Sequence, residues 1–139
     1  MRNGAAIACA LALGACSQAA PPPLTGEALI ARGDYLVNNI GGCNDCHTPM
    51  TPQGPDLSRA LQGAPLGFAP TVEMPWAPVA PPIAGIPGHY TEEQFVTFLQ
   101  TGVRPDGSRP LPPMPAFRLN EDDARAMTAY IQSLPAATE

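Results

Sequence analysis

Apolar residues recur at helical spacing in three segments of this 139-residue chain. The first predicted helix covers residues 27–40, begins at Thr25 or Gly26, and ends at Gly41 and Gly42. Its apolar side consists of Leu29, Leu36, Val37 and Ile40. Gly33 lies inside this helix, where glycine costs about 1 kcal/mol of helix stability relative to alanine. A glycine at this position indicates that another backbone approaches closely there.

The other two helices are predicted in the second half of the chain. One covers residues 92–101, with a capping box between Thr91 and Gln94 at its start and Gly102 at its end. Its apolar face is Phe95, Phe98 and Leu99. The last helix starts at Asn120, whose side chain can cap it, and stops before Pro135. Its inward stripe is Ala124, Met127, Ile131 and Leu134, with Tyr130 alongside.

The middle of the chain is rich in proline. Fifteen of the 19 prolines lie between Pro49 and Pro115, so this part can form neither a long helix nor a central strand. The chain is long enough for one small domain, and it shows neither an internal repeat nor a strand-like alternation. Three short helices and a proline-rich wrap bury little apolar surface, which favours a large apolar cofactor at the centre.

The first residues predict export from the cell. A positive start at residues 1–3 precedes an apolar run over residues 4–15, which is typical of a secretory signal and too short to span a bilayer. Residues 13–16 resemble the lipobox of bacterial lipoproteins, which predicts cleavage before Cys16 and acylation of this cysteine. An ordinary signal cut after Ala15, Ala19 or Ala20 is the alternative. The predicted organisation is a signal over 1–15, a proline-rich tether over 16–25 and a folded domain over 26–139.

The charge of the chain bears on its partners. All seven basic residues are arginines, and the formal net charge is -5. Nucleic-acid binding is therefore disfavoured, because nothing here could neutralise a run of phosphates.

The main chemical motif is the C-x-x-C-H segment formed by Cys43, Cys46 and His47, which is the attachment signature of c-type haem. Two thiols at this spacing can form thioethers with the vinyl groups of one haem, and the adjacent histidine can then bind the iron. A thioredoxin-like pair would need a βαβ context, which the pattern lacks. A zinc site would need four ligands, and beyond the two thiols only His47, His89 and carboxylates could supply them. One covalent haem c is the prediction.

At this point the chain resembles the class I cytochromes c, and more narrowly the single-haem cytochromes and modules that accompany bacterial periplasmic dehydrogenases. The resemblance covers roughly residues 27–135 and rests on residues 32–37, 43–49, 91–95, 101–107, 113–115 and 129–135. It implies an all-α fold in which three main short helices and a long proline-rich loop wrap around one covalent haem. It also implies that the first and last helices cross where Gly33 faces Tyr130.

The resemblance further implies a methionine shortly before the last helix as the second axial ligand of the iron, and Met114 matches this position. Pro113 and Pro115 restrict the backbone on both sides of it. The other candidates are Met50, Met74, Met127 and His89. Met74 is the main competitor, Met127 is more simply a core residue, and a lone histidine before a helix cap is more often at the surface or at a haem propionate.

Supporting residues follow from the same resemblance and from charge burial. Pro55 matches the proline whose carbonyl accepts the ring N–H of the proximal histidine. The two haem propionates need donors, because burying carboxylates without them is costly. Trp76, Arg104 and Arg109 are the candidates, and we favour this role for Arg109, which lies near Met114, and a solvated side chain for Arg104.

His/Met ligation leaves no vacant position at the iron and raises its potential, which predicts an electron carrier rather than an enzyme. We expect one-electron transfer through an exposed haem edge, between a periplasmic dehydrogenase or respiratory complex and an oxidase. The alternatives are a haem-based gas sensor or peroxidase with a labile methionine, and a thiol-disulfide oxidoreductase without haem. The predicted location is the periplasm, with a lipid anchor in a bacterial membrane. The outer membrane is favoured because Ser17, not aspartate, follows Cys16.

Overall fold

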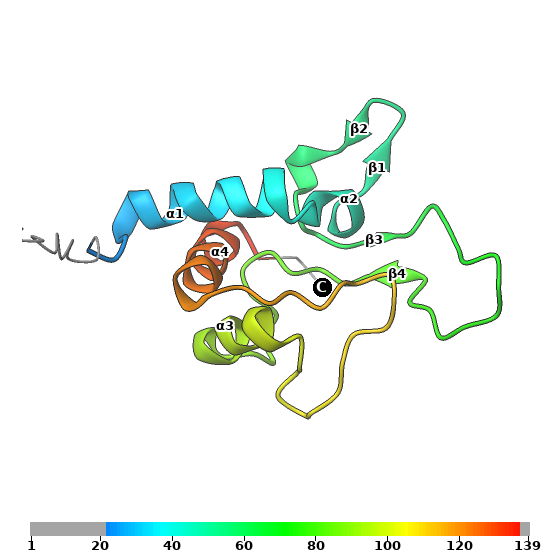
Figure 1. Cartoon of the computed structure of the whole chain (residues 1–139). Helices are drawn as coiled ribbons and strands as arrows, with labels where there is room; N and C mark the ends of the chain where they lie inside the picture. Colours follow the sequence, from blue (N-terminus) through cyan, green and yellow to red (C-terminus); the bar gives the residue numbers. More distant parts are fainter. Residues whose placement is uncertain (1–21, 137–139) are drawn as a thin grey trace, which may run out of the picture.

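The computed structural model describes residues 22–136, so the predicted signal, Cys16 and most of the predicted tether lie outside the described residues. Four α-helices dominate this part of the chain (Figure 1): α1 Gly26–Tyr35, α2 Cys43–His47, α3 Glu92–Thr101 and α4 Glu121–Ser133. Two short turns accompany them, the π-helical η1 Leu36–Ile40 and the 3₁₀-helical η2 Leu57–Arg59. The three predicted main helices are confirmed, and none of the described helices is long and apolar enough to cross a membrane.

Four strands of two residues each complete the described part. Strand β1 Met50–Thr51 pairs with β2 Gly54–Pro55, and β3 Ala64–Pro65 pairs with β4 Val79–Ala80, both antiparallel. These strands have no signal in the sequence, because pairs this short leave no detectable alternation. A long loop between β3 and β4 carries several of the prolines and extends away from the helices (Figure 1).

Helices α1 and α4 pack closely at Gly33, as predicted. A Cβ atom built on Gly33 would lie 2.0 Å from the carbonyl oxygen of Ala126 and 2.7 Å from the Cβ of Tyr130. Only glycine allows this contact between two backbones. Arg32 supports the crossing from the side, because its guanidinium forms an ion pair with Asp123 of α4 at 2.9 Å.

The end of the first helix differs from the prediction. The helix continues beyond α1 as the π-helical turn η1, which holds an extra residue per turn and rotates the side chains that follow. Leu36 and Val37 are buried as expected, but Ile40 is 63% exposed. The prediction that Ile40 belongs to the apolar side is therefore wrong.

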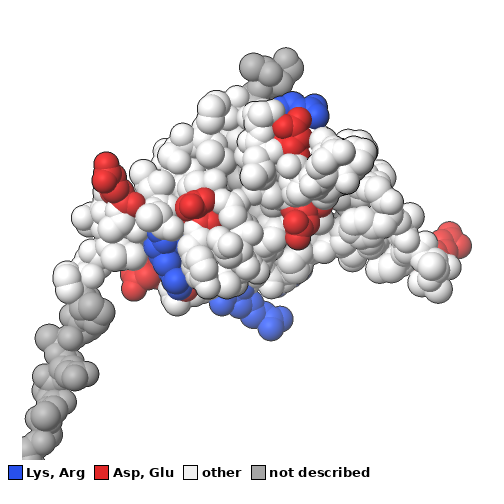
Figure 2. All heavy atoms as spheres, turned by 90° about the horizontal axis from the view of Figure 1, so that it is seen from above, with Lys and Arg blue, Asp and Glu red and all other residues white. Residues whose placement is uncertain are grey.

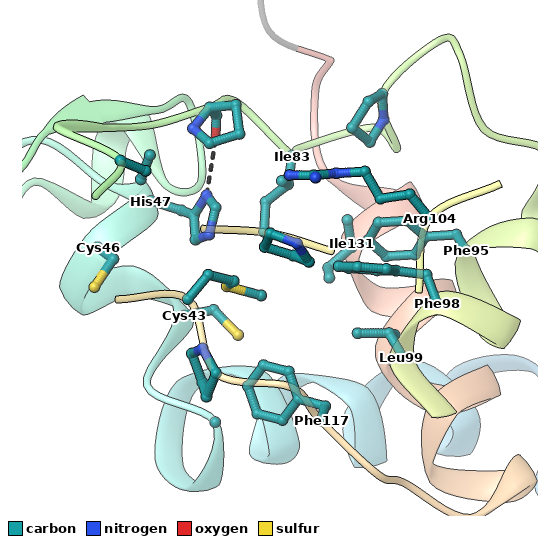
Figure 3. Close-up of a pocket in the computed structure, with 18 of the residues that line it drawn as sticks. Cys43, Cys46, His47, Ile83, Phe95, Phe98, Leu99, Arg104, Phe117 and Ile131 are labelled. Atoms are coloured by element: carbon teal, nitrogen blue, oxygen red, sulfur yellow. Dashed lines mark hydrogen bonds between the residues drawn. The ribbon is translucent and has the colours of Figure 1, made fainter. Parts of the chain in front are cut away.

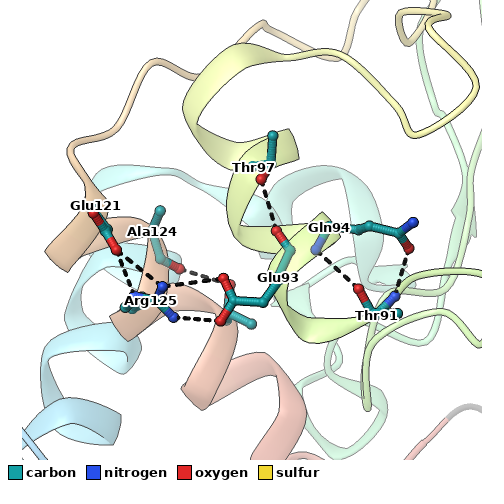
Figure 4. A network of polar contacts seen from close by, with 8 residues as sticks. Thr91, Glu93, Gln94, Thr97, Glu121, Ala124 and Arg125 are labelled. Carbon is teal, nitrogen blue, oxygen red and sulfur yellow. Dashed lines mark hydrogen bonds and ion pairs between the residues drawn. The ribbon is translucent and has the colours of Figure 1, made fainter.

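Helix α3 begins with the predicted capping box. The hydroxyl of Thr91 accepts the N–H of Gln94, and the Gln94 side chain accepts the N–H of Thr91 (Figure 4). Asn120 caps α4 by accepting the N–H of Asp123 at 2.8 Å. Each cap satisfies donors that have no partner within the first turn of a helix.

Arg125 connects α3 with α4. Its guanidinium donates to both carboxylate oxygens of Glu93 on α3, at 2.9 and 3.1 Å, and it also pairs with Glu121 one turn earlier on α4 (Figure 4). Hydrogen bonds from Arg125 and its positive charge hold the pKa of Glu93 below its ordinary value. The two helices are thus joined at the surface as well as through their apolar faces.

Replacing Glu93 with glutamine is expected to give a pH-dependent loss of stability. Because the pKa of Glu93 is lowered in the folded protein, its contribution is present above the ordinary carboxyl pKa and is lost as the pH falls through the lowered value. Denaturant unfolding of wild type and E93Q should therefore differ at neutral pH and converge in acid. E92Q, which removes a neighbouring charge outside this network, is the control, and an equal pH dependence in both variants would contradict this role of Arg125.

The core lies where α1, α3 and α4 meet, and it reaches the C-x-x-C-H segment through Cys43. Met127 and Ile131 of α4 are almost fully buried, together with Phe95, Phe98 and Leu99 of α3. Charged side chains are scattered over the face seen in Figure 2, most of which is uncharged.

Candidate haem-binding site

A cavity of about 350 Å³ lies between α2, α3, α4 and the proline-rich loops (Figure 3). This volume is within the range of roughly 300–1,000 Å³ that is usual for cofactor and ligand sites. Most of the lining is apolar and includes Ile83, Phe98, Leu99, Phe117, Met127 and Ile131. The side chains with polar or sulfhydryl groups in this lining are Cys43, Cys46, His47, His89, Tyr90 and Arg104.

Helix α2 presents both thiols and His47 to this cavity. Gly42 precedes the helix in the left-handed conformation, with φ of 59°, and allows the chain to turn from η1 into α2. Cys43 is buried, Cys46 is half-buried, and both are free thiols. Burial raises the pKa of the Cys43 thiol to about 11 and also raises the pKa of Cys46. A thiol-disulfide oxidoreductase lowers the pKa of its redox-active thiol, and neither cysteine shows this direction here.

The imidazole of His47 is held in one orientation. Its Nδ1–H donates to the carbonyl of Pro81 at 2.7 Å, and the residue is only 6% exposed (Figure 3). Burial lowers the pKa of His47, while the hydrogen bond to Pro81 acts in the opposite direction. Because Nδ1 is engaged by Pro81, Nε2 is the nitrogen left available to a metal.

The prediction that Pro55 supplies this carbonyl is wrong. Pro55 lies in β2, where it pairs with Met50 of β1, and the acceptor is Pro81 in the segment after β4. The hairpin of β1 and β2 is a local structure that carries Pro55 away from the ring of His47. The acceptor instead comes from the segment that joins β4 to the loop before α3.

The methionines separate according to their surroundings. Met114 is half-buried and lines the cavity, whereas its main competitor Met74 is 42% exposed and lies outside the lining. Met50 is also exposed, on β1. Met127 reaches the cavity from α4 but is part of the core, as expected. Met114 is thus the methionine outside the core that faces the cavity in the described part of the chain.

Of the two candidate arginines, the structure places Arg104 in the cavity lining and Arg109 outside it. Arg104 lines the cavity and extends among its apolar side chains (Figure 3). Arg109 is exposed, does not line the cavity, and donates to the carbonyl of Thr101 at the end of α3 at 3.1 Å. Arg109 thus lies at the C-terminus of α3, where a cation is favourable, and its contact with a propionate stays a prediction.

Trp76 precedes the lining residue Ala77 in sequence but is not itself part of the cavity lining. Its ring packs edge-on against Phe68, with centroids 5.7 Å apart, and its indole Nε1 is buried without a hydrogen-bond partner. A buried N–H donor without an acceptor is rare and costs about 1–3 kcal/mol. An unpaired donor at this place suits a carboxylate of a bound cofactor, and the apolar cavity with two thiols and an imidazole suits a covalently bound haem.

A zinc site is not supported by the residues between 22 and 136. In this part of the chain, no three residues among histidine, cysteine, aspartate and glutamate come together in a group that could hold a metal ion. The two thiols and His47 face an apolar cavity without a carboxylate to complete a tetrahedral set.

Comparison with known proteins identifies the class of this protein. The family model for cytochrome c matches residues 30–135, and the chain belongs to this family. The class I cytochrome c fold predicted from the sequence is thereby confirmed, and the family implies covalently bound haem c.

Several curated relatives are cytochrome subunits of dehydrogenases. The chain is 36% identical over 135 residues to the cytochrome c subunit of the quinone alcohol dehydrogenase of Gluconobacter oxydans, which covers 94% of this chain and 27% of that subunit. It is 30% identical over 116 residues to the fructose dehydrogenase cytochrome subunit of Gluconobacter japonicus, covering 78% of this chain and 22% of the relative. A diheme c-type cytochrome of Cereibacter sphaeroides is 30% identical over 118 residues, covering 76% and 35%. The chain thus spans about a quarter to a third of these relatives.

Proposed function

We propose that this protein is an electron carrier with one c-type haem, attached through Cys43 and Cys46 and ligated by His47 and Met114. The observation that carries the proposal is the position of the C-x-x-C-H segment at the apolar cavity, with Met114 in the lining of the same cavity. Membership of the cytochrome c family supports it. The relatives that are cytochrome subunits of dehydrogenases support an electron-transfer role.

The residues of the chain account for the properties that a carrier needs. Haem supplies the one-electron chemistry when it is bound. Donation of the His47 Nδ1–H to Pro81 fixes the ring and increases the basicity of its other nitrogen. With His47 and Met114 as ligands, the thioether would favour reduced iron and no position at the iron would be left for a substrate. The apolar lining excludes water, and Trp76 and Arg104 can donate to the propionates.

The proposed partners are redox proteins, with a periplasmic dehydrogenase or respiratory complex on one side and an oxidase on the other. Acylation of Cys16 and a tether over residues 16–25 would attach the domain to a membrane on the periplasmic side. The chain after the predicted signal is acidic and lacks lysine, so docking through basic residues of the partner, or confinement on one membrane, would replace a ring of lysines on this protein.

Spectroscopy and gas binding test this function. The purified protein produced with c-type haem maturation should be reduced by a quinone-dependent alcohol dehydrogenase and its substrate, and reoxidised by a cytochrome oxidase preparation. Its ferrous form should not bind carbon monoxide at neutral pH. Rapid binding of carbon monoxide or turnover of peroxide would favour the sensor or peroxidase alternative.

Replacing Trp76 with phenylalanine tests whether its indole N–H donates to a propionate. The sign of the change in stability separates a donor that binds a propionate from one that has no acceptor. Phenylalanine keeps the aromatic contact with Phe68 and removes the buried N–H. If the donor binds a propionate, W76F loses about 1–2 kcal/mol of stability in the haem-loaded protein. If the donor has no acceptor there, the substitution is neutral or stabilising. Denaturant unfolding monitored at the haem absorption measures the difference, with F68L as the control for the aromatic contact alone.

A further inference from the structure

A chain of hydrogen bonds runs behind the C-x-x-C-H segment, away from the cavity. Thr48 follows His47 directly and is only 1% exposed. Its hydroxyl donates to the Oδ1 of Asn44, one turn earlier in α2, and accepts the backbone N–H of Leu61 at 2.8 Å. The amide of Asn44 donates to Asn38, whose own amide donates to the hydroxyl of Tyr130 at 3.0 Å.

The direction of these bonds fixes the role of the Thr48 hydroxyl. A hydroxyl has one proton to donate, and here Asn44 accepts it, which leaves the oxygen lone pairs for the N–H of Leu61. Leu61 is fully buried and has a positive φ of 59°, a conformation that costs a residue with a side chain about 1 kcal/mol or more unless its surroundings fix it. Thr48 supplies part of that fixation.

Leu61 begins a short segment, residues 61–63, that lies between α2 and the segment carrying Pro81. The N–H of Gly63 donates to the carbonyl of His47 at 2.7 Å. On the other side, the carbonyl of Leu61 accepts the N–H groups of Ile83 and Ala84 at 2.9 and 3.1 Å. Gly63 also packs so closely on Pro82 that an added Cβ would lie 2.7 Å from the Pro82 nitrogen.

Pro81 depends on this segment for its position. Pro81 and Pro82 have no backbone N–H, so neither can anchor itself as a donor. The flanking residues must hold the Pro81 carbonyl in place: Ala80 pairs with Ala64 in the strands β3 and β4, and Ile83 binds the carbonyl of Leu61. Both anchors belong to residues 61–64, which include Leu61, the residue that Thr48 binds.

We propose that Thr48 is a positioning residue for the proximal ligand, because it holds the Pro81 carbonyl against the Nδ1–H of His47 through residues 61–63. The inference rests on the proposed ligation of haem iron by His47. A firmly accepted Nδ1 proton increases electron donation from the ring to the iron and stabilises the oxidised state. Loosening the acceptor therefore raises the midpoint potential and exposes the ring proton to exchange with solvent.

The test compares T48V and T48S with a matched control in the haem-loaded protein. Valine has nearly the shape of threonine without the hydroxyl, and serine keeps the hydroxyl. T128V is the control, because Thr128 is equally buried and its hydroxyl only donates to the Ala124 carbonyl of its own helix, at 2.7 Å. The readouts are the midpoint potential and the exchange rate of the His47 Nδ1 proton, measured by NMR on the ferrous protein.

T48V should raise the midpoint potential and speed the exchange of the ring proton by about tenfold, as expected for an acceptor geometry weakened by about 1.4 kcal/mol. T48S should restore both values, and T128V should leave both at the wild-type level. If T48V and T128V lose stability alike while T48V keeps the wild-type potential and exchange rate, Thr48 is only structural and the inference fails. A wild-type protein without haem, or without histidine ligation, would instead contradict the proposed function itself.

Discussion

M114A is expected to open one face of the haem iron. Met114 is the methionine outside the core that lines the cavity in the described part of the chain, and under the proposed ligation the loss of its thioether would leave the iron with His47 alone. The absorption band of ferric iron bound to a thioether should disappear, and the midpoint potential should fall because the soft ligand that favours reduced iron is lost. The ferrous variant should bind carbon monoxide rapidly, unlike the wild type. Spectra and a redox titration of the purified variant measure these changes.

The chain contains its own control for this substitution. Met74 also precedes a proline but is exposed and outside the cavity lining, so M74A should keep the absorption band and the potential. Loss of the band in M74A with its retention in M114A would assign the ligand to Met74. Retention in both variants would assign the ligand to another methionine, of which Met127 also lines the cavity, whereas absence of the band from the wild type would favour His89 of the same lining.

G33A should be the most destabilising single-atom addition among the helices. Helix propensity alone favours alanine over glycine by about 1 kcal/mol. The new Cβ would lie 2.0 Å from the carbonyl oxygen of Ala126, and since this is backbone, α1 and α4 would have to move apart. We expect a net loss of about 3 kcal/mol or more in the free energy of unfolding. Denaturant unfolding of the haem-loaded protein measures it.

G67A is the control for this prediction. Gly67 lies in the loop between β3 and β4, and a Cβ built there meets nothing within 4 Å. Its effect should stay within about 0.5 kcal/mol. A gain of stability in G33A would mean that the two helices do not cross as closely as the structure has them.

The helices could be predicted because their signals are local. The capping box at Thr91 and Gln94, the cap at Asn120 and the apolar stripe of α4 are each contained in a few consecutive residues. The contact of Gly33 followed from the cost of a glycine inside a helix, together with the family resemblance. Ile40 was misplaced because nothing in its surroundings indicates the π-helical turn, which shifts the helical spacing by one residue.

The supporting residues of the site could not be predicted in the same way. Pro55 and Pro81 lie in similar proline-rich surroundings, and only the course of the loops decides which carbonyl meets His47. The short sequence distance between Arg109 and Met114 did not indicate which arginine lines the cavity. Arg104, just after α3, lies in the lining, whereas Arg109 donates to the carbonyl of Thr101. One signal was available for Pro81. The segment from Ala80 to Ala84 contains two consecutive prolines, which offer carbonyl acceptors but have no backbone N–H donors of their own.

The mass and haem content of the peptide that contains Cys43 and Cys46 test the central claim most directly. Protease digestion of the purified, exported protein, followed by mass spectrometry and pyridine haemochrome analysis, should give this peptide with the added mass of one haem. Both cysteines should then be inert to alkylating reagents, and the haemochrome spectrum should be that of two thioether bonds. A folded protein whose peptide carries two alkylatable thiols and no haem would contradict the account.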